Sequence, residues 1–473
     1  MHPSMSRRSM LLTGAAALAC HGIRSLAQGS SATKIPTGKP DHTLRIEPCT
    51  LEIAKGVAIQ TVAYNGQVPG PLLRLKEGVP VTIDVTNATE KEDIVHWHGL
   101  ATDSLNDGAM EEGSPMIPPG ATLRYRLVPR PAGTRWYHTH AGAREGDTED
   151  LTRGTYSGQF GFLLVEGSSQ PAAYDQELNL AIHHWQPSFV PMVETMRSVS
   201  ANKPQTSGSD VGYKYATINM HALGAGEPIR VKQGQRVLLR LLNASATENV
   251  ELALPGHSFK ILAMDGNPVP ISRNVETLSL AVAERVDAIV EMNHPGVWVL
   301  GSTLQPSRQM GLGIVVEYEG RSGPPIWKDP APAQWDYTQF ARTGPVLEPD
   351  KTYTMTFRDA GALNGSHFDT WTINDDAWPE IKPFEAQQGK RYRLLFRNAS
   401  GDQHPMHLHR HTFEVTSIGG VSINGLRKDV VNVMPLDTVA VDFIADNPGD
   451  TLVHCHQQLH MDYGFMQLIK YVD

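Results

Sequence analysis

Apolar and polar residues alternate along two matching stretches of this chain. Valine and isoleucine stand at positions 81, 83 and 85, and valine and leucine stand at positions 237, 239 and 241. A period of two is typical of a strand that buries one face and exposes the other. Glycine and proline are also plentiful, as the turns between short strands require. The pattern predicts an all-β fold.

Both stretches belong to a longer repeat. A glycine followed nine residues later by Asn-Ala occurs at Gly78, Gly234 and Gly389, at spacings of 156 and 155 residues. The tripeptide Thr-Ile-Asn recurs 155 residues apart, starting at Thr217 and Thr372. A unit of this length is a domain duplication and not a solenoid repeat. The chain is therefore predicted to contain three consecutive β-sandwich domains, in line with about 100–200 residues per domain.

Loop-forming residues mark the expected domain boundaries. One lies near Gly167-Ser168-Ser169, and the other is the proline-rich stretch between residues 320 and 345. We expect domain 1 at residues 28–167 and domain 2 at residues 168–320. A linker at residues 321–345 and domain 3 at residues 346–473 follow.

Residues 1–27 have the features of an export signal. Arg7-Arg8 precede an apolar run, and a Ser-Leu-Ala cleavage site stands before Gln28. The pattern predicts export of the folded protein by the twin-arginine machinery, to the periplasm or the exterior. The alternative is a lipoprotein box that ends at Cys20. No other apolar run is long enough to span a membrane.

The net charge disfavours one class of partner. The formal charge is −9, and loss of residues 1–27 removes three arginines and no acid, which gives −12. Because an acidic protein repels the phosphate backbone, we expect no nucleic acid partner.

Histidines are clustered. The chain has 20 of them, and chance predicts roughly one His-x-His pair, whereas five occur. The clusters, in chain order, are His96-Trp97-His98-Gly99, His138-Thr139-His140, His404-Pro405-Met406-His407-Leu408-His409, and His454-Cys455-His456 followed by His460.

The last cluster has the composition of two metal sites. On a strand, His454 and His456 face one way and Cys455 faces the other. Two histidines and a cysteine are the ligands of blue-copper electron-transfer sites. His404 lies three residues before His407, on the opposite strand face, and is free to join Cys455. The alternative for an isolated His-Cys-His is a buried structural cysteine with surface histidines.

In this order the four clusters resemble the copper motifs of the multicopper oxidases, the laccase and cuprous oxidase family, over nearly the whole mature chain. The resemblance to bacterial members implies cupredoxin-like Greek-key sandwiches and four coppers per chain. It implies a type 1 copper on His404, Cys455 and His460, and a type 2 copper on His96 and His407. The type 3 pair would take His98, His138, His140, His409, His454 and His456.

The weak axial position of the type 1 site is Phe465 in the family's register, where many bacterial relatives have Met. A non-coordinating Phe is expected to raise the reduction potential, because an axial thioether favours oxidised copper. Met466 is the alternative axial group if the register shifts by one residue.

Two carboxylates are candidates for catalysis. Asp107 matches the family's acidic residue near the type 2 copper and is the candidate proton relay; a turn at Asn-Asp-Gly is the alternative. Several relatives carry Glu directly after the last type 1 histidine, where this chain has Met461. Asp462 could substitute, although by strand parity it would face the other way.

The remaining histidines and cysteine are expected to be structural. His411 has a counterpart, His257, in a region without a copper motif, which indicates packing or a shared hydrogen bond. His183 and His184 are adjacent and point to opposite strand faces. A disulfide between Cys49 and Cys455 would consume the copper thiolate, so we expect a free Cys49.

The motifs predict where chemistry occurs and leave the substrate open. They fall in domains 1 and 3 only, so the trinuclear cluster should lie between those domains, with domain 2 as a spacer. A laccase-like enzyme would oxidise phenols or aromatic amines and reduce O2 to water. A cuprous oxidase acting on Cu(I) is the alternative, although no Met-rich insert precedes His404. A copper-free cell-division scaffold of the same fold predicts broken motifs, and all are intact.

Overall fold

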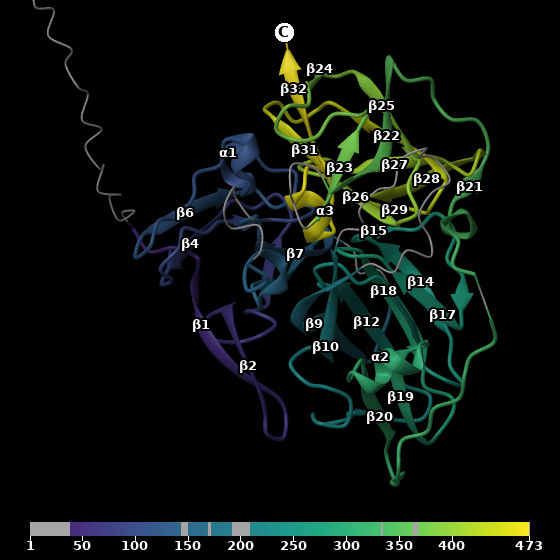
Figure 1. Ribbon diagram of the computed structural model, residues 1–473. Helices are drawn as coiled ribbons and strands as arrows, with labels where there is room; N and C mark the ends of the chain where they lie inside the picture. The colour runs from purple at the N-terminus through teal and green to yellow at the C-terminus, as the bar shows by residue number, and fades with distance from the viewer. Residues whose placement is uncertain are drawn as a thin grey trace, which may run out of the picture. The chain divides into compact units, whose positions relative to one another are not determined.

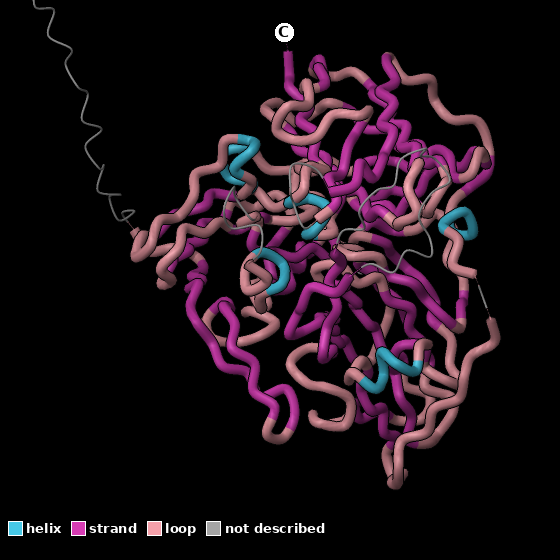
Figure 2. Tube along the Cα trace, in the orientation of Figure 1, coloured by secondary structure: helices cyan, strands magenta, loops and turns pink. Residues whose placement is uncertain are grey.

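The computed structural model describes residues 38–142, 150–168, 172–191, 209–332, 334–362 and 368–472. The predicted export signal and Cys20 lie outside these residues. The described residues form six sheets that pair into three consecutive sandwiches, so the all-β prediction is confirmed (Figures 1 and 2). The domain boundaries at 167, 320 and 345 stay predictions.

The first sandwich pairs two four-stranded sheets, with orders β2-β1-β4-β6 and β3-β8-β7-β5. Its strands are β1 (His42–Ala54), β2 (Val57–Tyr64), β3 (Leu73–Lys76), β4 (Val81–Asn87), β5 (Val95–His96), β6 (Thr122–Leu127), β7 (Gly133–Thr139) and β8 (Phe160–Glu166). Its helices are one-turn segments: α1 (Ser104–Asp107), η1 (Met110–Glu112) and η2 (Gly154–Tyr156).

The second sandwich has one sheet of order β10-β9-β12-β18-β14-β15, with β16 beside β14, and one of order β11-β20-β19-β13-β17. Its elements are β9 (Gln176–Pro191), β10 (Ser209–Ile218), β11 (Ile229–Val231), β12 (Arg236–Asn243), β13 (Val250–Ala253), β14 (Phe259–Met264), β15 (Asn267–Pro268), β16 (Asn274–Val275), β17 (Thr277–Leu280), β18 (Arg285–Glu291), β19 (Val297–Ser302), α2 (Gln305–Gln309) and β20 (Gly313–Tyr318).

The third sandwich has orders β21-β28-β27-β30-β25-β22-β23 and β24-β32-β31-β26-β29. Its elements are η4 (Tyr337–Phe340), β21 (Arg342–Thr343), β22 (Lys351–Ala362), β23 (Asp369–Ile373), β24 (Phe384–Gln387), β25 (Arg391–Asn398), β26 (His404–Leu408), β27 (Phe413–Ile418), β28 (Val421–Lys428), β29 (Val430–Val433), β30 (Thr438–Ile444), β31 (Thr451–Cys455), α3 (Gln458–Asp462) and β32 (Met466–Val472).

The sequence repeat corresponds to one strand pattern used three times. The runs β2-β1-β4-β6, β10-β9-β12-β18 and β23-β22-β25-β30 have the same order, each with one parallel pair. The repeated asparagine ends the central strand and is buried. Asn398, for example, donates from Nδ2 to the carbonyls of Asp402, Val433 and Met434. Asn87 and Asn243 likewise donate from Nδ2 to two backbone carbonyls each, so the repeated side chain joins the end of the central strand to neighbouring backbone segments.

The sandwiches share apolar contacts. On β4 buried and half-buried residues alternate strictly, as predicted. On β12 both faces are largely buried, because Leu242 packs with Trp136 and Phe162 of the first sandwich. The alternation predicted for β12 is therefore weaker than the sequence suggested.

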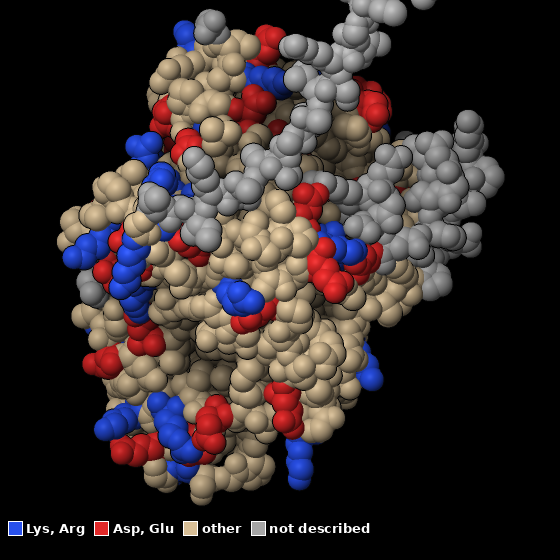
Figure 3. Space-filling model, turned by 90° about the vertical axis from the view of Figure 1, so that its left-hand side faces the viewer, with Lys and Arg blue, Asp and Glu red and all other residues tan. Residues whose placement is uncertain are grey.

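Acidic and basic side chains are interspersed on the face shown in Figure 3. None of the helices among the described residues is long and apolar enough to cross a membrane.

Candidate metal centre

Three predicted type 1 ligands meet in the third sandwich. His404 begins β26, Cys455 ends β31, and His460 lies on α3. The Sγ atom of Cys455 lies 3.5 Å from Nδ1 of His460 and 3.8 Å from Nδ1 of His404, and the two Nδ1 atoms are 3.2 Å apart. A sulfur and two imidazole nitrogens at this separation can bind one ion.

The surroundings set which nitrogens are available. Nε2 of His404 is 2.8 Å from Oγ of Ser400, whose hydroxyl donates to Asn398, so His404 carries its proton on Nε2 and presents Nδ1. Burial lowers the pKa of His460 to about 3 and raises the pKa of the Cys455 thiol. A neutral imidazole is ready to bind a metal, and the thiolate needs the positive charge of an ion beside it.

Phe465, and not Met466, packs at this site. The Phe465 ring centroid is 4.8 Å from that of His404, and the residue is fully buried in the core cluster that contains Cys455. Met466 packs with Leu452 and Leu468 in a separate cluster. This packing supports Phe465 in the axial direction.

The other eight predicted ligands converge between the first and third sandwiches. His96 and His98 come from β5 and the turn after it, and His138 and His140 from the end of β7. Nδ1 of His98 is 3.4 Å from Nε2 of His138, and Nε2 of His409 is 3.1 Å from Nε2 of His454. The full set is His96, His98, His138, His140, His407, His409, His454 and His456, all buried.

Hydrogen bonds point the free nitrogens of this cluster at one another. His96 and His407 use Nδ1 to contact the carbonyls of Asp107 and Asp429, at 2.9 and 2.7 Å, and each leaves its buried Nε2 without a partner. Both ring nitrogens of His140 and His456 are also unpartnered. Buried polar atoms rarely stay unsatisfied, so a converging set of them fits a metal cluster.

Burial keeps the imidazoles neutral. It lowers the pKa of His140 to about 3 and lowers the pKa of His98, His138 and His454 well below the usual value, with neighbouring imidazoles adding to the effect. Metal binding needs the deprotonated ring. The residues present therefore fit a copper cluster.

Asp107 lies inside this centre. Its Oδ2 is 2.8 Å from Nδ1 of His409 and 3.1 Å from Nδ1 of His96, and its side chain is fully buried. The next residue, Gly108, closes α1 with φ +88°, and a Cβ there would lie 1.8 Å from the carbonyl oxygen of Val95. The turn is thus formed by Gly108, while the Asp107 carboxylate contacts histidines.

Two further carboxylates contact the cluster and were missed by sequence reasoning. Glu112 on η1 accepts a hydrogen bond from the backbone N of Leu452, and its Oε1 is 3.5 Å from Nδ1 of His409. Burial, with Asp107 adding to it, raises the pKa of Glu112 well above its usual value. Asp429 contacts His98 at 3.1 Å. In the sequence, Glu112 is marked only by its position five residues after Asp107.

The strand-parity argument for Asp462 is wrong, because residues 458–462 form the short helix α3. Asp462 accepts a hydrogen bond of 2.8 Å from Nε2 of Gln458. The same glutamine accepts from Thr155 in the first sandwich. Asp462 therefore lies at the contact between the first and third sandwiches.

The histidines expected to be structural are hydrogen-bonded. His257 and His411 each contact a tyrosine hydroxyl through Nε2, at 2.5 and 2.7 Å, which confirms the shared role. His183 and His184 contact the carbonyl of Ala244 and the hydroxyl of Ser245. Cys49 is a free, half-buried thiol, as predicted.

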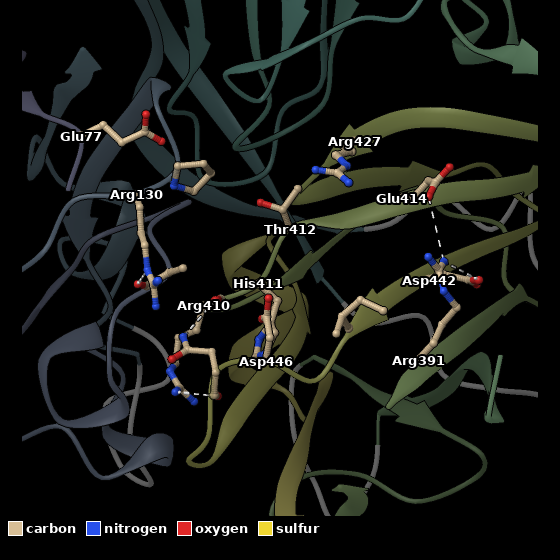
Figure 4. A pocket seen from close by; sticks show the side chains of 14 residues that line it. Glu77, Arg130, Arg391, Arg410, His411, Thr412, Glu414, Arg427, Asp442 and Asp446 are labelled. Carbon is tan, nitrogen blue, oxygen red and sulfur yellow. Dashed lines mark hydrogen bonds and ion pairs between the residues drawn. The ribbon is translucent and has the colours of Figure 1, made fainter. Parts of the chain in front are cut away.

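A pocket of about 390 Å³ lies beside the third sandwich, and its lining contains none of the eleven predicted copper ligands. Figure 4 shows Arg391 directed at Asp442, to which it donates at 3.3 Å, and Arg427 directed toward Thr412. His411 also lines this pocket. The pocket is distinct from the metal centre.

Comparison with known proteins agrees with the geometry. Three family models described as multicopper oxidase match residues 45–170, 136–318 and 349–472. The multicopper oxidase MmcO of Mycobacterium tuberculosis is 29% identical over 95% of this chain and 91% of its own length. Laccase-1 of Botryotinia fuckeliana is 27% identical over 98% and 86%.

A solved structure supports the same fold. The multicopper oxidase of Pseudomonas thermotolerans matches with a TM-score of 0.68 at 26% identity, over 92% of this chain and 100% of that one. Cupredoxin-like sandwiches, converging histidines and matching family models lead to one conclusion. The chain belongs to the multicopper oxidase family and is a copper-dependent oxidoreductase that uses O2.

Proposed function

We propose that the protein is a laccase-like enzyme that oxidises phenols and aromatic amines one electron at a time. One observation carries the proposal: two buried sets of metal-ligating side chains are joined by three consecutive residues. Cys455 belongs to one set, and its neighbours His454 and His456 belong to the other. Bound copper would supply the one-electron oxidation of substrate and the four-electron reduction of O2 to water.

The proposed ligand set uses eleven residues and four coppers per chain. His404, Cys455 and His460 hold the type 1 copper, and His96 and His407 hold the type 2 copper through Nε2. The type 3 pair is held by His98, His138, His140, His409, His454 and His456. The unpartnered nitrogens of His96 and His407 support the type 2 assignment.

Electrons enter at His460 and leave through Cys455. His460 is 6% exposed, whereas His404 is fully buried, so the His460 edge is the one nearer solvent. Cys455 is covalently joined to both neighbouring histidines. The backbone thus gives electrons a short bonded path between the two donor groups.

Asp107 is the proposed proton relay, holding the proton at Oδ1, the oxygen that makes no hydrogen bond, or passing it to the oxygen-reducing centre. Its contacts to His96 and His409 support this role. Asp462 is the second candidate. It lies one residue after Met461, the position at which several relatives have a glutamate.

Substrate class follows from the type 1 surroundings. A phenyl ring in the axial direction favours a higher potential, which suits phenols. The thioethers of Met461 and Met466 pack with Leu452 in a buried cluster, so they are not arranged as soft ligands for Cu(I) beside His460. Cuprous oxidase activity is the competing candidate.

The proposed location is the periplasm or the exterior, reached by the twin-arginine route. That route exports folded protein, which suits an enzyme whose copper sites need the finished fold. Replacement of Arg7 and Arg8 by lysine should leave the protein in the cytoplasm.

Oxygen uptake by the copper-loaded protein tests the function. A methoxyphenol and stabilised Cu(I) are offered separately at matched concentrations. Faster uptake with the phenol supports the laccase proposal, and faster uptake with Cu(I) replaces it with cuprous oxidase activity. No uptake with either would contradict both.

A further inference from the structure

A buried ion network lies below the histidine cluster, where side chains of all three domains meet. Its centre is Asp429, between β28 and β29. Arg285 of the second sandwich donates from Nη1 to Oδ1 at 2.7 Å and from Nη2 to Oδ2 at 2.6 Å. Arg135 of the first sandwich donates to Oδ2 at 3.3 Å. A bidentate guanidinium fixes both the place and the orientation of a carboxylate.

Asp429 in turn contacts two predicted copper ligands. Its Oδ1 is 3.1 Å from Nε2 of His98, and its backbone oxygen is 2.7 Å from Nδ1 of His407. Because both oxygens accept, His98 carries its proton on Nε2 and His407 on Nδ1. The two rings stack with centroids 3.8 Å apart. One residue therefore sets the tautomer and orientation of two ligands.

The second sandwich also holds the backbone of this segment. Nζ of Lys428 is 2.9 Å from Asp265 and 2.9 Å from Glu284, and both carboxylates belong to that sandwich. Asp265 accepts from the backbone N of Asp429 and Val430, at 3.3 and 3.1 Å. The segment that follows β28 is thus tied to the domain that has no copper motif.

The glycine of the first copper motif is explained by the same network. A Cβ on Gly99 would lie 2.8 Å from Oδ2 of Asp429 and 2.9 Å from Nη2 of Arg285, and φ is +84°. A side chain there would push the ion pair away from His98. The backbone of the histidine motif therefore packs directly on Arg285 and Asp429.

We propose that Arg285 is a positioning residue for the copper cluster, acting through Asp429 on His98 and His407. The second sandwich then contributes to the oxygen-reducing centre and is more than a spacer. The inference rests on the proposed ligand assignment. A merely structural role, in which the ion pair only ties domains together, predicts lower stability without any change at the copper.

Matched variants separate the two roles. Arg285→Lys keeps the charge and loses the bidentate geometry, and Asp429→Asn keeps the shape and loses the charge. The control pair is Arg240→Lys and Asp287→Asn. Arg240 and Asp287 form a 2.7 Å ion pair at the contact with the first sandwich, where both bind the hydroxyl of Thr134. The control ion pair thus lies within the second sandwich and contacts the first through a threonine and not a histidine.

The readouts are copper retained against a chelator and the electron paramagnetic resonance signal of the type 2 copper, with the blue type 1 band as an internal control of folding. We expect Arg285→Lys and Asp429→Asn to weaken copper binding at the cluster by about 10–100-fold and to change the type 2 signal, with the blue band intact. The double variant should be no worse than Asp429→Asn alone, because both act through one contact.

Three results would overturn the inference: wild-type retention and type 2 signal in Arg285→Lys, loss of the blue band together with the cluster, or the same copper loss in the control pair. A wild-type protein that binds type 1 copper but no cluster copper would instead refute the ligand assignment itself.

Discussion

Replacement of Asp107 separates proton delivery from ligand positioning. In Asp107→Asn the amide oxygen can take the place of Oδ2 and accept from Nδ1 of His409, as Oδ2 does at 2.8 Å. The amide nitrogen can then face Glu112, whose Oε2 accepts no hydrogen bond. His96 keeps its 2.9 Å contact with the backbone carbonyl of residue 107. The variant therefore preserves the geometry and removes only the exchangeable proton.

Asp107→Ala removes both functions. Nδ1 of His409 would be left with Oε1 of Glu112 at 3.5 Å, which is too long for a good hydrogen bond. Loss of such a supporting contact costs about 10–100-fold in metal affinity. For Asp107→Asn we expect copper retention near the wild-type level. Removal of a general acid typically costs about 10²–10⁴-fold, and we expect the lower end, because Glu112 borders the same nitrogen. A hundredfold loss corresponds to about 2.7 kcal/mol of barrier.

The assay follows the blue colour in a stopped-flow instrument. The copper-loaded protein is reduced with a methoxyphenol without oxygen and then mixed with O2. Reduction of the type 1 copper should be unchanged in Asp107→Asn, because its proposed ligands His404, Cys455 and His460 form a group that does not include Asp107. The return of blue colour should be about a hundredfold slower. Return within about threefold of wild type would refute the proton role and leave Asp107 as a positioning residue.

Three more changes have defined outcomes. Phe465→Met should lower the type 1 reduction potential in a redox titration, and an unchanged potential would remove Phe465 from the axial position. Asn398→Ala should lower the free energy of unfolding by about 3 kcal/mol in urea, because the change removes a buried amide that donates to three carbonyls and accepts from Ser400. A loss below about 1 kcal/mol would contradict this. Burial raises the pKa of Glu248 to about 7, and the negative charge of Asp210 adds to the shift. The protonated Glu248 carboxyl therefore contributes its full stability at pH 4, and this stability is lost as the pH rises through 7. Glu248→Gln should therefore have a higher Tm than wild type at pH 8 and an equal Tm at pH 4. If the Tm values of the two proteins change with pH in parallel, the raised pKa of Glu248 is refuted.

Local patterns were sufficient to predict the repeat and the histidine geometry. Strand parity correctly separated Cys455 from His454 and His456, because β31 continues in extended form up to the cysteine. Parity also correctly placed His404 on the face of β26 opposite His407, where its ring lies beside Cys455. The fold class followed from a 155-residue repeat whose buried asparagines perform one task.

Parity failed where the chain leaves the strand. Residues after His456 turn into α3, so the direction of Asp462 could not be derived from a period of two. Glu112 and Asp429 were missed because their contacts span 297 and 331 residues of sequence, to His409 and His98. Charges brought together by domain packing leave no periodic signal, which is also why Arg285 was not found.

Eleven residues are proposed to build two connected copper sites. This assignment can be tested by copper analysis and electron paramagnetic resonance of the loaded wild type and of His96→Ala. We predict four coppers per wild-type chain, with one type 1 and one type 2 signal and a silent coupled pair. His96→Ala should lose the type 2 signal and keep the type 1 signal. A type 2 signal that survives in His96→Ala, or a wild type that carries type 1 copper alone, would contradict the claim.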